Sequence, residues 1–208
     1  MLRRHIYALA LVTACLAAPA VANGPTLPTK LAKMEAADFR KAAIVEDDNL
    51  EFHAMISTRE GFRKSQKMTG TSWGDNHLVA RIDKRSGATE YEVHQFVRYL
   101  GSRRTYGAVQ FEGADGNLVA RKVDQANHGD DICPNSDFNG DCSLTKNIVF
   151  KVDENLLKSI AGRSGGWDYK FKSDKVEDLR ATLSPAEAEG LLMAVADYRA
   201  RTSRQASR

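Results

Sequence analysis

Three histidines occupy positions where strand patterns can bring them together. His77 and His94 lie on either side of the turn-like residues 84–87, and His53 lies in an earlier alternating segment. Opposed imidazoles on a solvent-facing sheet can share a zinc or copper ion, with His53 or a nearby acid completing the ligand set. No His-Glu-x-x-His or similar motif accompanies them. The pattern makes His77 and His94 candidate metal ligands, with ordinary surface histidines as the alternative.

A second candidate metal site lies between two later cysteines. Asn135, Asp137 and Asn139 alternate ahead of Gly140, an arrangement similar to the first half of a calcium-binding loop. The second half is missing, because Lys146 stands where a bidentate glutamate is needed. Asn, Asp and Gly also favour plain turns. We therefore interpret this segment as a turn, with calcium binding as the alternative.

A serine motif offers a third kind of chemistry. Gly162, Ser164 and Gly166 have the spacing of the Gly-x-Ser-x-Gly nucleophile elbow of hydrolases. That elbow needs a strand before the serine and a helix after it. Here a helical pattern precedes the motif and a strand pattern follows it. We expect a helix end and a connector, and no catalytic role for Ser164.

The first 22 residues have the pattern of a secretory signal peptide. Arg3 and Arg4 precede an apolar run over 6–16, and Ala20 to Ala22 form a small-x-small site, so we predict cleavage after Ala22. The alternative is a lipoprotein box ending at Cys15, which would then carry a lipid anchor. The apolar character continues after Cys15, which disfavours it. No later stretch is long and apolar enough to span a membrane, so we expect a periplasmic or secreted protein.

Export determines how the remaining cysteines are interpreted. Cys133 and Cys142 are the only two left after cleavage, in a compartment that oxidises thiols. Their spacing is not Cys-x-x-Cys, and no second pair completes a four-ligand zinc site. We predict a disulfide that closes a ten-residue loop and contributes about 2.5–3 kcal/mol in the chain-entropy model.

Composition and charge exclude several classes of protein. With 208 residues, 42% hydrophobic and 27% charged, the chain is neither collagenous, wholly disordered nor a multi-pass membrane protein. The net charge of +3 comes from the two ends, since residues 23–198 hold 24 of the 30 basic residues and all 27 acidic ones. A mildly acidic body on an exported chain argues against a nucleic-acid partner.

The hydrophobic periodicity predicts an α+β fold. A leader covers 23–49, with residues 30–45 favouring a helix. Two-residue alternation from Leu50 onward predicts eight strands joined by short turns, at 50–56, 78–82, 91–99, 104–111, 117–124, 148–152, 167–171 and 179–183. Such strands form a mainly antiparallel sheet, as a meander, a sandwich or a partly closed barrel. We expect one domain over 50–198.

Two helices complete this prediction. Asp153 is suited to capping a short helix that ends at Gly162 in the left-handed conformation. Ser184 and Glu187 have the spacing of a capping box, and they begin an amphipathic C-terminal helix that should lie against the sheet. The basic residues 199–208 should form a flexible tail.

The register of one hairpin follows from its turn. A four-residue loop at 84–87, with Gly87 in the left-handed conformation, pairs residues whose numbers add to 171. This register sets Leu78 beside Val93 on the buried face and His77 beside His94 on the other face. Phe96 is a candidate exposed ring that, with nearby arginines, suits a glycan, a peptide or a nucleic acid strand. The alternative is that most of the aromatic residues form the core.

The run from Ile82 to Tyr91, the paired cysteines and the closing Leu183 to Glu187 with its helix together resemble a group of uncharacterised exported bacterial proteins, over about residues 50–198. The resemblance implies a cell-envelope setting and brings no activity, cofactor or catalytic residue. We expect a non-enzymatic module that binds a protein, a glycan or a small ligand of the cell envelope. The alternative is a metal-dependent or other hydrolase that uses surface histidines and acids.

Overall fold

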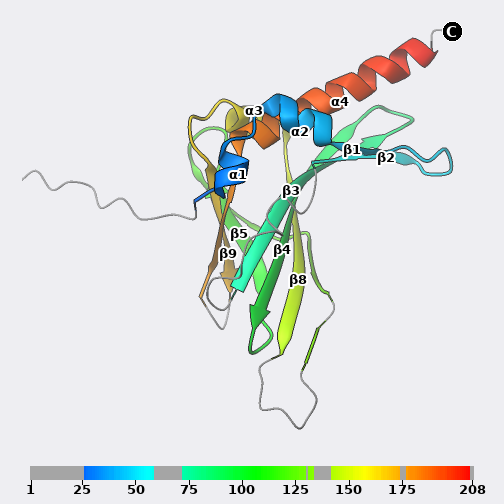
Figure 1. Cartoon of the computed structure of the whole chain (residues 1–208). Helices are drawn as coiled ribbons and strands as arrows, with labels where there is room; N and C mark the ends of the chain where they lie inside the picture. The colour runs from blue at the N-terminus through cyan, green and yellow to red at the C-terminus, as the bar shows by residue number, and fades with distance from the viewer. Residues whose placement is uncertain (1–25, 59–71, 130, 134–141, 174–176, 207–208) are drawn as a thin grey trace, which may run out of the picture.

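The computed structural model describes residues 26–58, 72–129, 131–133, 142–173 and 177–206. They form two antiparallel sheets that are not closed into a barrel, together with four helices (Figure 1). The six-stranded sheet has the order β1 (Ile44–Glu46), β2 (His53–Ser57), β3 (Ser72–Asp83), β4 (Thr89–Leu100), β8 (Ser143–Val152) and β7 (Gln125–His128). The four-stranded sheet has the order β10 (Leu179–Leu183), β9 (Trp167–Ser173), β5 (Tyr106–Glu112) and β6 (Leu118–Lys122). The predicted α+β class is confirmed.

The hydrophobic core lies between the two sheets. Every second residue of β3, β4 and β8 points inward, and these side chains meet those of β5, β9 and β10. Phe150 of β8 lies at the centre, with its ring centroid 5.8 Å from that of Phe111 and 5.4 Å from that of Tyr169. Most aromatic residues are therefore core residues, as the alternation indicates.

The helices gather at one end of the sheets (Figure 1). They are α1 (Thr29–Ala32), α2 (Ala36–Ala42), α3 (Glu154–Ala161) and α4 (Pro185–Ala206). The buried residues Ala188, Leu191 and Val195 join α4 to the core. Asp153 caps α3 as predicted, accepting a hydrogen bond of 2.7 Å from the Leu156 N–H. Within the described ranges, no helix has the length and apolar character needed to cross a membrane.

The predicted strand from Leu50 begins later than expected. Leu50 and Phe52 are 91% and 65% exposed, because β2 starts at His53 and the residues before it form a loop. Lys84 holds this loop: its N–H donates to the Phe52 carbonyl at 3.0 Å, and its Nζ lies 2.5 Å from an Asp47 carboxylate oxygen. Local tethering therefore displaces two apolar residues that fit the alternation.

Three helix predictions also need correction. The single helix expected over 30–45 is divided into α1, α2 and the start of β1. Gly162 ends α3 with φ −81°, a right-handed and not a left-handed conformation. The tail expected to be flexible from residue 199 continues α4 to Ala206.

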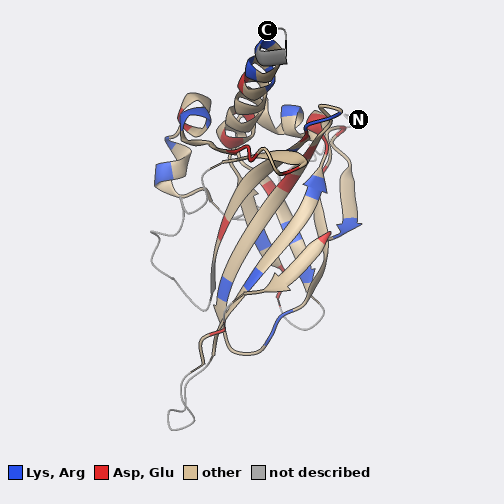
Figure 2. Ribbon diagram, turned by 90° about the vertical axis from the view of Figure 1, so that its right-hand side faces the viewer, with Lys and Arg blue, Asp and Glu red and all other residues tan. Residues whose placement is uncertain are grey.

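The continuation of α4 has a physical cause. Arg204 Nε donates to the Ala200 carbonyl at 2.9 Å, so a basic side chain binds a carbonyl in the last turns of the helix. Arginine is a good helix former, and positive charge near the C-terminus complements the helix dipole. In Figure 2 the basic residues of α4 lie toward its C-terminal end.

The predicted hairpin register is confirmed. β3 and β4 pair Leu78 with Val93 and His77 with His94, and Gly87 in the turn has φ +72°. The inner residues of this hairpin contribute to the core, whereas the alternate residues form the outer face of the six-stranded sheet.

Candidate ligand-binding site

His77 and His94 lie side by side on the outer face of the six-stranded sheet. Their ring centroids are 5.1 Å apart, and both rings are half-buried. The cross-strand pairing of β3 with β4 accounts for this proximity, because directly opposed residues on one face have neighbouring side chains. The histidines therefore have the relative placement that the turn at 84–87 predicts.

Strand pairing arranges the surrounding side chains in two rows. The first, here called the Phe96 row, crosses β3, β4, β8 and β7 as Asp75, Phe96, Asn147 and Asn127. The second, the His94 row, crosses the same strands as His77, His94, Val149 and Gln125. These eight side chains line a hollow of about 460 Å³ in the outer face, a volume typical of small-ligand sites.

A second hollow of about 270 Å³ lies on the other side of the histidine pair. Its lining includes Met55, Val79 and Arg81 and reaches β1 at Ile44. His77 and His94 line both hollows. The histidine pair is thus the divide between two adjoining depressions of one sheet face.

Glu92 anchors the histidine side of the site. Only 5% of the residue is exposed, and its carboxylate lies 2.8 Å from His94 Nε2 and 3.2 Å from Arg81 Nε. The hydrogen bond from His94 holds the pKa of Glu92 below its usual value, assisted by the Arg81 charge and opposed by desolvation. An ionised carboxylate can only accept hydrogen bonds, so His94 donates to it from Nε2.

Side chains on the inner face of the sheet fix the backbone of the Phe96 row. Gln95 points toward the core, where its Nε2 donates to the carbonyls of Asp75 at 3.0 Å and Phe96 at 2.8 Å. A Cβ on Gly74 would lie 2.7 Å from that same nitrogen, so a larger residue at 74 would displace the amide. Gln95 also accepts from the Tyr169 hydroxyl at 2.9 Å, which joins this network to the other sheet.

The histidine pair alone does not complete a metal site. Over the described ranges, no group of three or more His, Cys, Asp or Glu side chains is arranged to hold a metal ion. His53 lies on the same sheet but pairs with Asp83, at a distance of 3.8 Å between His53 Nε2 and a carboxylate oxygen. Metal binding by His77 and His94 remains a prediction.

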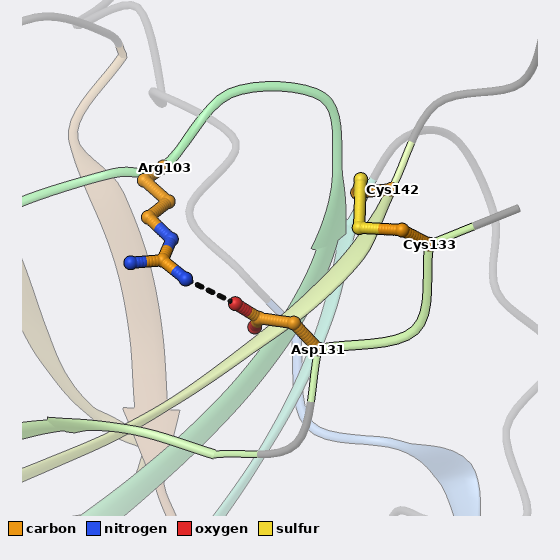
Figure 3. Close-up of a disulfide and its surroundings, with 4 residues drawn as sticks. All are labelled: Arg103, Asp131, Cys133 and Cys142. Carbon is orange, nitrogen blue, oxygen red and sulfur yellow. Dashed lines mark hydrogen bonds and ion pairs between the residues drawn. A yellow bond between two sulfur atoms is a disulfide. The ribbon is translucent and has the colours of Figure 1, made fainter. Parts of the chain in front are cut away.

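The predicted disulfide between Cys133 and Cys142 is present (Figure 3). It lies next to an ion pair in which Arg103 Nη2 is 2.9 Å from an Asp131 carboxylate oxygen. The proposed calcium ligands Asn135, Asp137 and Asn139 lie outside the described residues. Ser164 is exposed between α3 and β9, so the order of elements is the reverse of a nucleophile elbow.

The sequence-based candidates did not include Glu92, which pairs with His94, or the lining residues Asp75, Gln125 and Asn127. Asp75 and Glu92 each lie two residues before a candidate histidine, so the hairpin register alone places them on the same face. The amides of Gln125 and Asn127 gave no signal, because β7 has no apolar alternation. The chain matches no family model, no curated protein and no solved structure in comparisons with known proteins.

Proposed function

We propose that this protein is an exported binding module that holds a small polar ligand in the hollow between the Phe96 row and the His94 row. The observation that carries the proposal is the hollow itself, about 460 Å³, where amide, imidazole and carboxylate side chains from four adjacent strands lie beside Phe96 and Val149. A polar ligand can be oriented there by side chains that the core does not use.

The export part of the proposal is supported by the leader sequence and by the disulfide. Mass spectrometry of the protein recovered from cells expressing the full chain tests it. A mature chain starting at Asn23 in the periplasm or medium is the expected result. A mature chain that starts at a lipid-modified Cys15 would show that the exported protein is lipid-anchored. Full-length chain in the cytosol with alkylatable cysteines would contradict export.

The binding part is tested by screening small polar compounds with ligand-observed NMR. Asn147 is exposed in the Phe96 row, so Asn147→Trp fills the hollow without changing the core. Compounds that bind the unmodified protein should lose binding in this variant. Asn155→Trp, at an exposed position of α3, is the matched control and should keep it. Binding that is equal in both variants, or absent from the screen, would overturn the proposal.

A second candidate function is metal-dependent hydrolysis. The 5.1 Å between the His77 and His94 rings favours it, because two imidazoles this close can bind one zinc or copper ion. Zinc titration of the unmodified protein, His77→Ala and His94→Ala tests it. Binding lost in both variants, together with zinc-dependent ester hydrolysis, would support this function. Binding that survives either substitution would exclude the pair as ligands.

A further inference from the structure

We infer that the hollow binds an uncharged saccharide. This inference rests on the binding function proposed above. The charge of the lining sets the first limit. No Lys or Arg is among the described residues that line the hollow, and its polar groups are amides, imidazoles and the Asp75 carboxylate. An anionic ligand would find no fixed cation there and would face a carboxylate. A lipid chain would offer no hydrogen-bond partner to the amides of the lining.

The Phe96 row supplies the chemistry that a sugar ring needs. Phe96 is half-buried and lines the hollow, with Asp75 opposite it on β3 and Asn147 opposite it on β8. A pyranose has an apolar C–H face and a rim of hydroxyls, so its face can lie on the aromatic ring. An amide offers both donors and acceptors, so the exposed Asn147 can bind neighbouring hydroxyls, whereas Asp75 is only 2% exposed and contributes less contact.

The length of the rows suits more than one sugar unit. Four strands at about 4.8 Å spacing extend the Phe96 row over about 14 Å from β3 to β7. Asn127 and Gln125 on β7 provide further amides at the far end. The site therefore fits a short oligosaccharide better than a single ring.

A peptide is a poorer fit to the same surface. Peptides bind sheets mostly through backbone hydrogen bonds at an edge strand. The hollow lies on the face of the sheet, where β4 and β8 are each paired on both sides and offer only side chains. A ligand whose own recognition groups are hydroxyls needs no backbone partner.

Calorimetric titration with maltotriose, cellotriose and tri-N-acetylchitotriose tests the inference, with trialanine and inorganic phosphate as comparison probes. At least one trisaccharide should bind, and phosphate should not. Phe96→Leu and Asn147→Ala should each weaken that binding by about tenfold. Asn155→Ala, which removes an exposed amide from α3, should leave it unchanged. Asn147 is exposed, so its variant keeps the test valid even where Phe96→Leu alters the fold.

The outcomes distinguish a failure of the saccharide inference from a failure of the proposed binding function. Trialanine or phosphate binding that depends on Asn147, without any trisaccharide binding, would overturn the saccharide inference. The proposed binding function would still be supported. Trisaccharide binding that neither variant weakens would show that the hollow is not the site. Absence of binding by all three trisaccharides would also overturn the inference, whereas the broader screen with Asn147→Trp decides the binding function.

Discussion

Gly190 of α4 lies directly against Phe39 of α2: a Cβ at position 190 would be 2.5 Å from the Phe39 Cβ and 2.8 Å from the Ala36 carbonyl oxygen. Gly190→Ala gains about 1 kcal/mol of helix propensity. It also overpacks a contact that includes backbone atoms, at a cost of about 1–3 kcal/mol. We expect a lower free energy of unfolding in urea. Ala196→Gly, at an exposed position of α4, reports propensity alone. A more stable Gly190→Ala protein would contradict the close crossing.

Glu92→Gln should make stability depend less on pH. The pKa of Glu92 is lowered in the folded protein, chiefly by the His94 hydrogen bond. Its ionised form therefore stabilises the fold above the unfolded pKa of about 4.3, and this contribution is lost as pH falls through the lower folded pKa. The stability gap between the unmodified protein and Glu92→Gln should be widest near neutrality and should narrow below about pH 4. Thermal unfolding across this range measures it.

The control for Glu92 is its neighbour on the same strand. Glu90 is exposed and pairs with Lys151, with 2.8 Å between Lys151 Nζ and a carboxylate oxygen. Exposed ion pairs contribute little, so Glu90→Gln should change stability by less than about 1 kcal/mol. If both variants show the same pH profile, the hydrogen bond from His94 to Glu92 is not the cause of the pH dependence.

Loss of the Cys133–Cys142 disulfide should lower the free energy of unfolding. The bridge has a sequence separation of 9, and the chain-entropy model gives about 2.5–3 kcal/mol for a loop of this size. Urea unfolding of the double variant Cys133→Ser and Cys142→Ser measures the difference. A reducing agent should destabilise the unmodified protein by a similar amount and leave the double variant unaffected. Equal stability with and without reductant would contradict the prediction.

Tyr169→Phe should lower both the free energy of unfolding and the affinity for ligand. Asn76 Nδ2 donates to the Tyr169 hydroxyl at 2.5 Å, and that hydroxyl donates to Gln95 Oε1. The variant leaves a buried amide oxygen without its donor, which costs about 1–3 kcal/mol. Because Gln95 holds the backbone of Asp75 and Phe96, ligand affinity should also fall.

Tyr198→Phe is the matched control for Tyr169. It removes a hydrogen bond to the exposed residue Asp47, and the cost should stay below about 1 kcal/mol with ligand affinity unchanged. Urea unfolding and calorimetric titration compare the two variants. An equal loss of stability and of ligand affinity in both variants would show that the buried hydrogen-bond network of Tyr169 has no special role.

The sequence predicts local structure here more completely than long-range pairing. The turn around Gly87 determined the β3–β4 register, and with it the facing of His77 and His94, because turn geometry and alternation act over a few residues. Alternation alone included Leu50 and Phe52 in a strand, although Lys84 holds them in a loop. A tether from a turn about thirty residues further along the chain has no signature in the local pattern.

The hollow itself could be predicted only in part. Asp75 and Phe96 follow from the same hairpin register as the histidines. Asn147 and Asn127 come from β8 and β7, whose places beside β4 depend on the division of the strands into two sheets. That division reflects packing between distant segments, such as Phe150 with Phe111 and Tyr169, and no local pattern encodes it.

The turn at residues 84–87 has a consequence for how this protein can change. It lies at the other end of the hairpin from the Phe96 row, yet it determines which side chains of β3 and β4 face outward. Adding a single residue there while keeping a four-residue loop would shift the β3–β4 register by one residue and send the outward-facing residues of one strand to the opposite side. A register shift of this kind keeps the same side chains facing outward only in steps of two residues, so a change in this distant turn can alter which ligands the outer face binds.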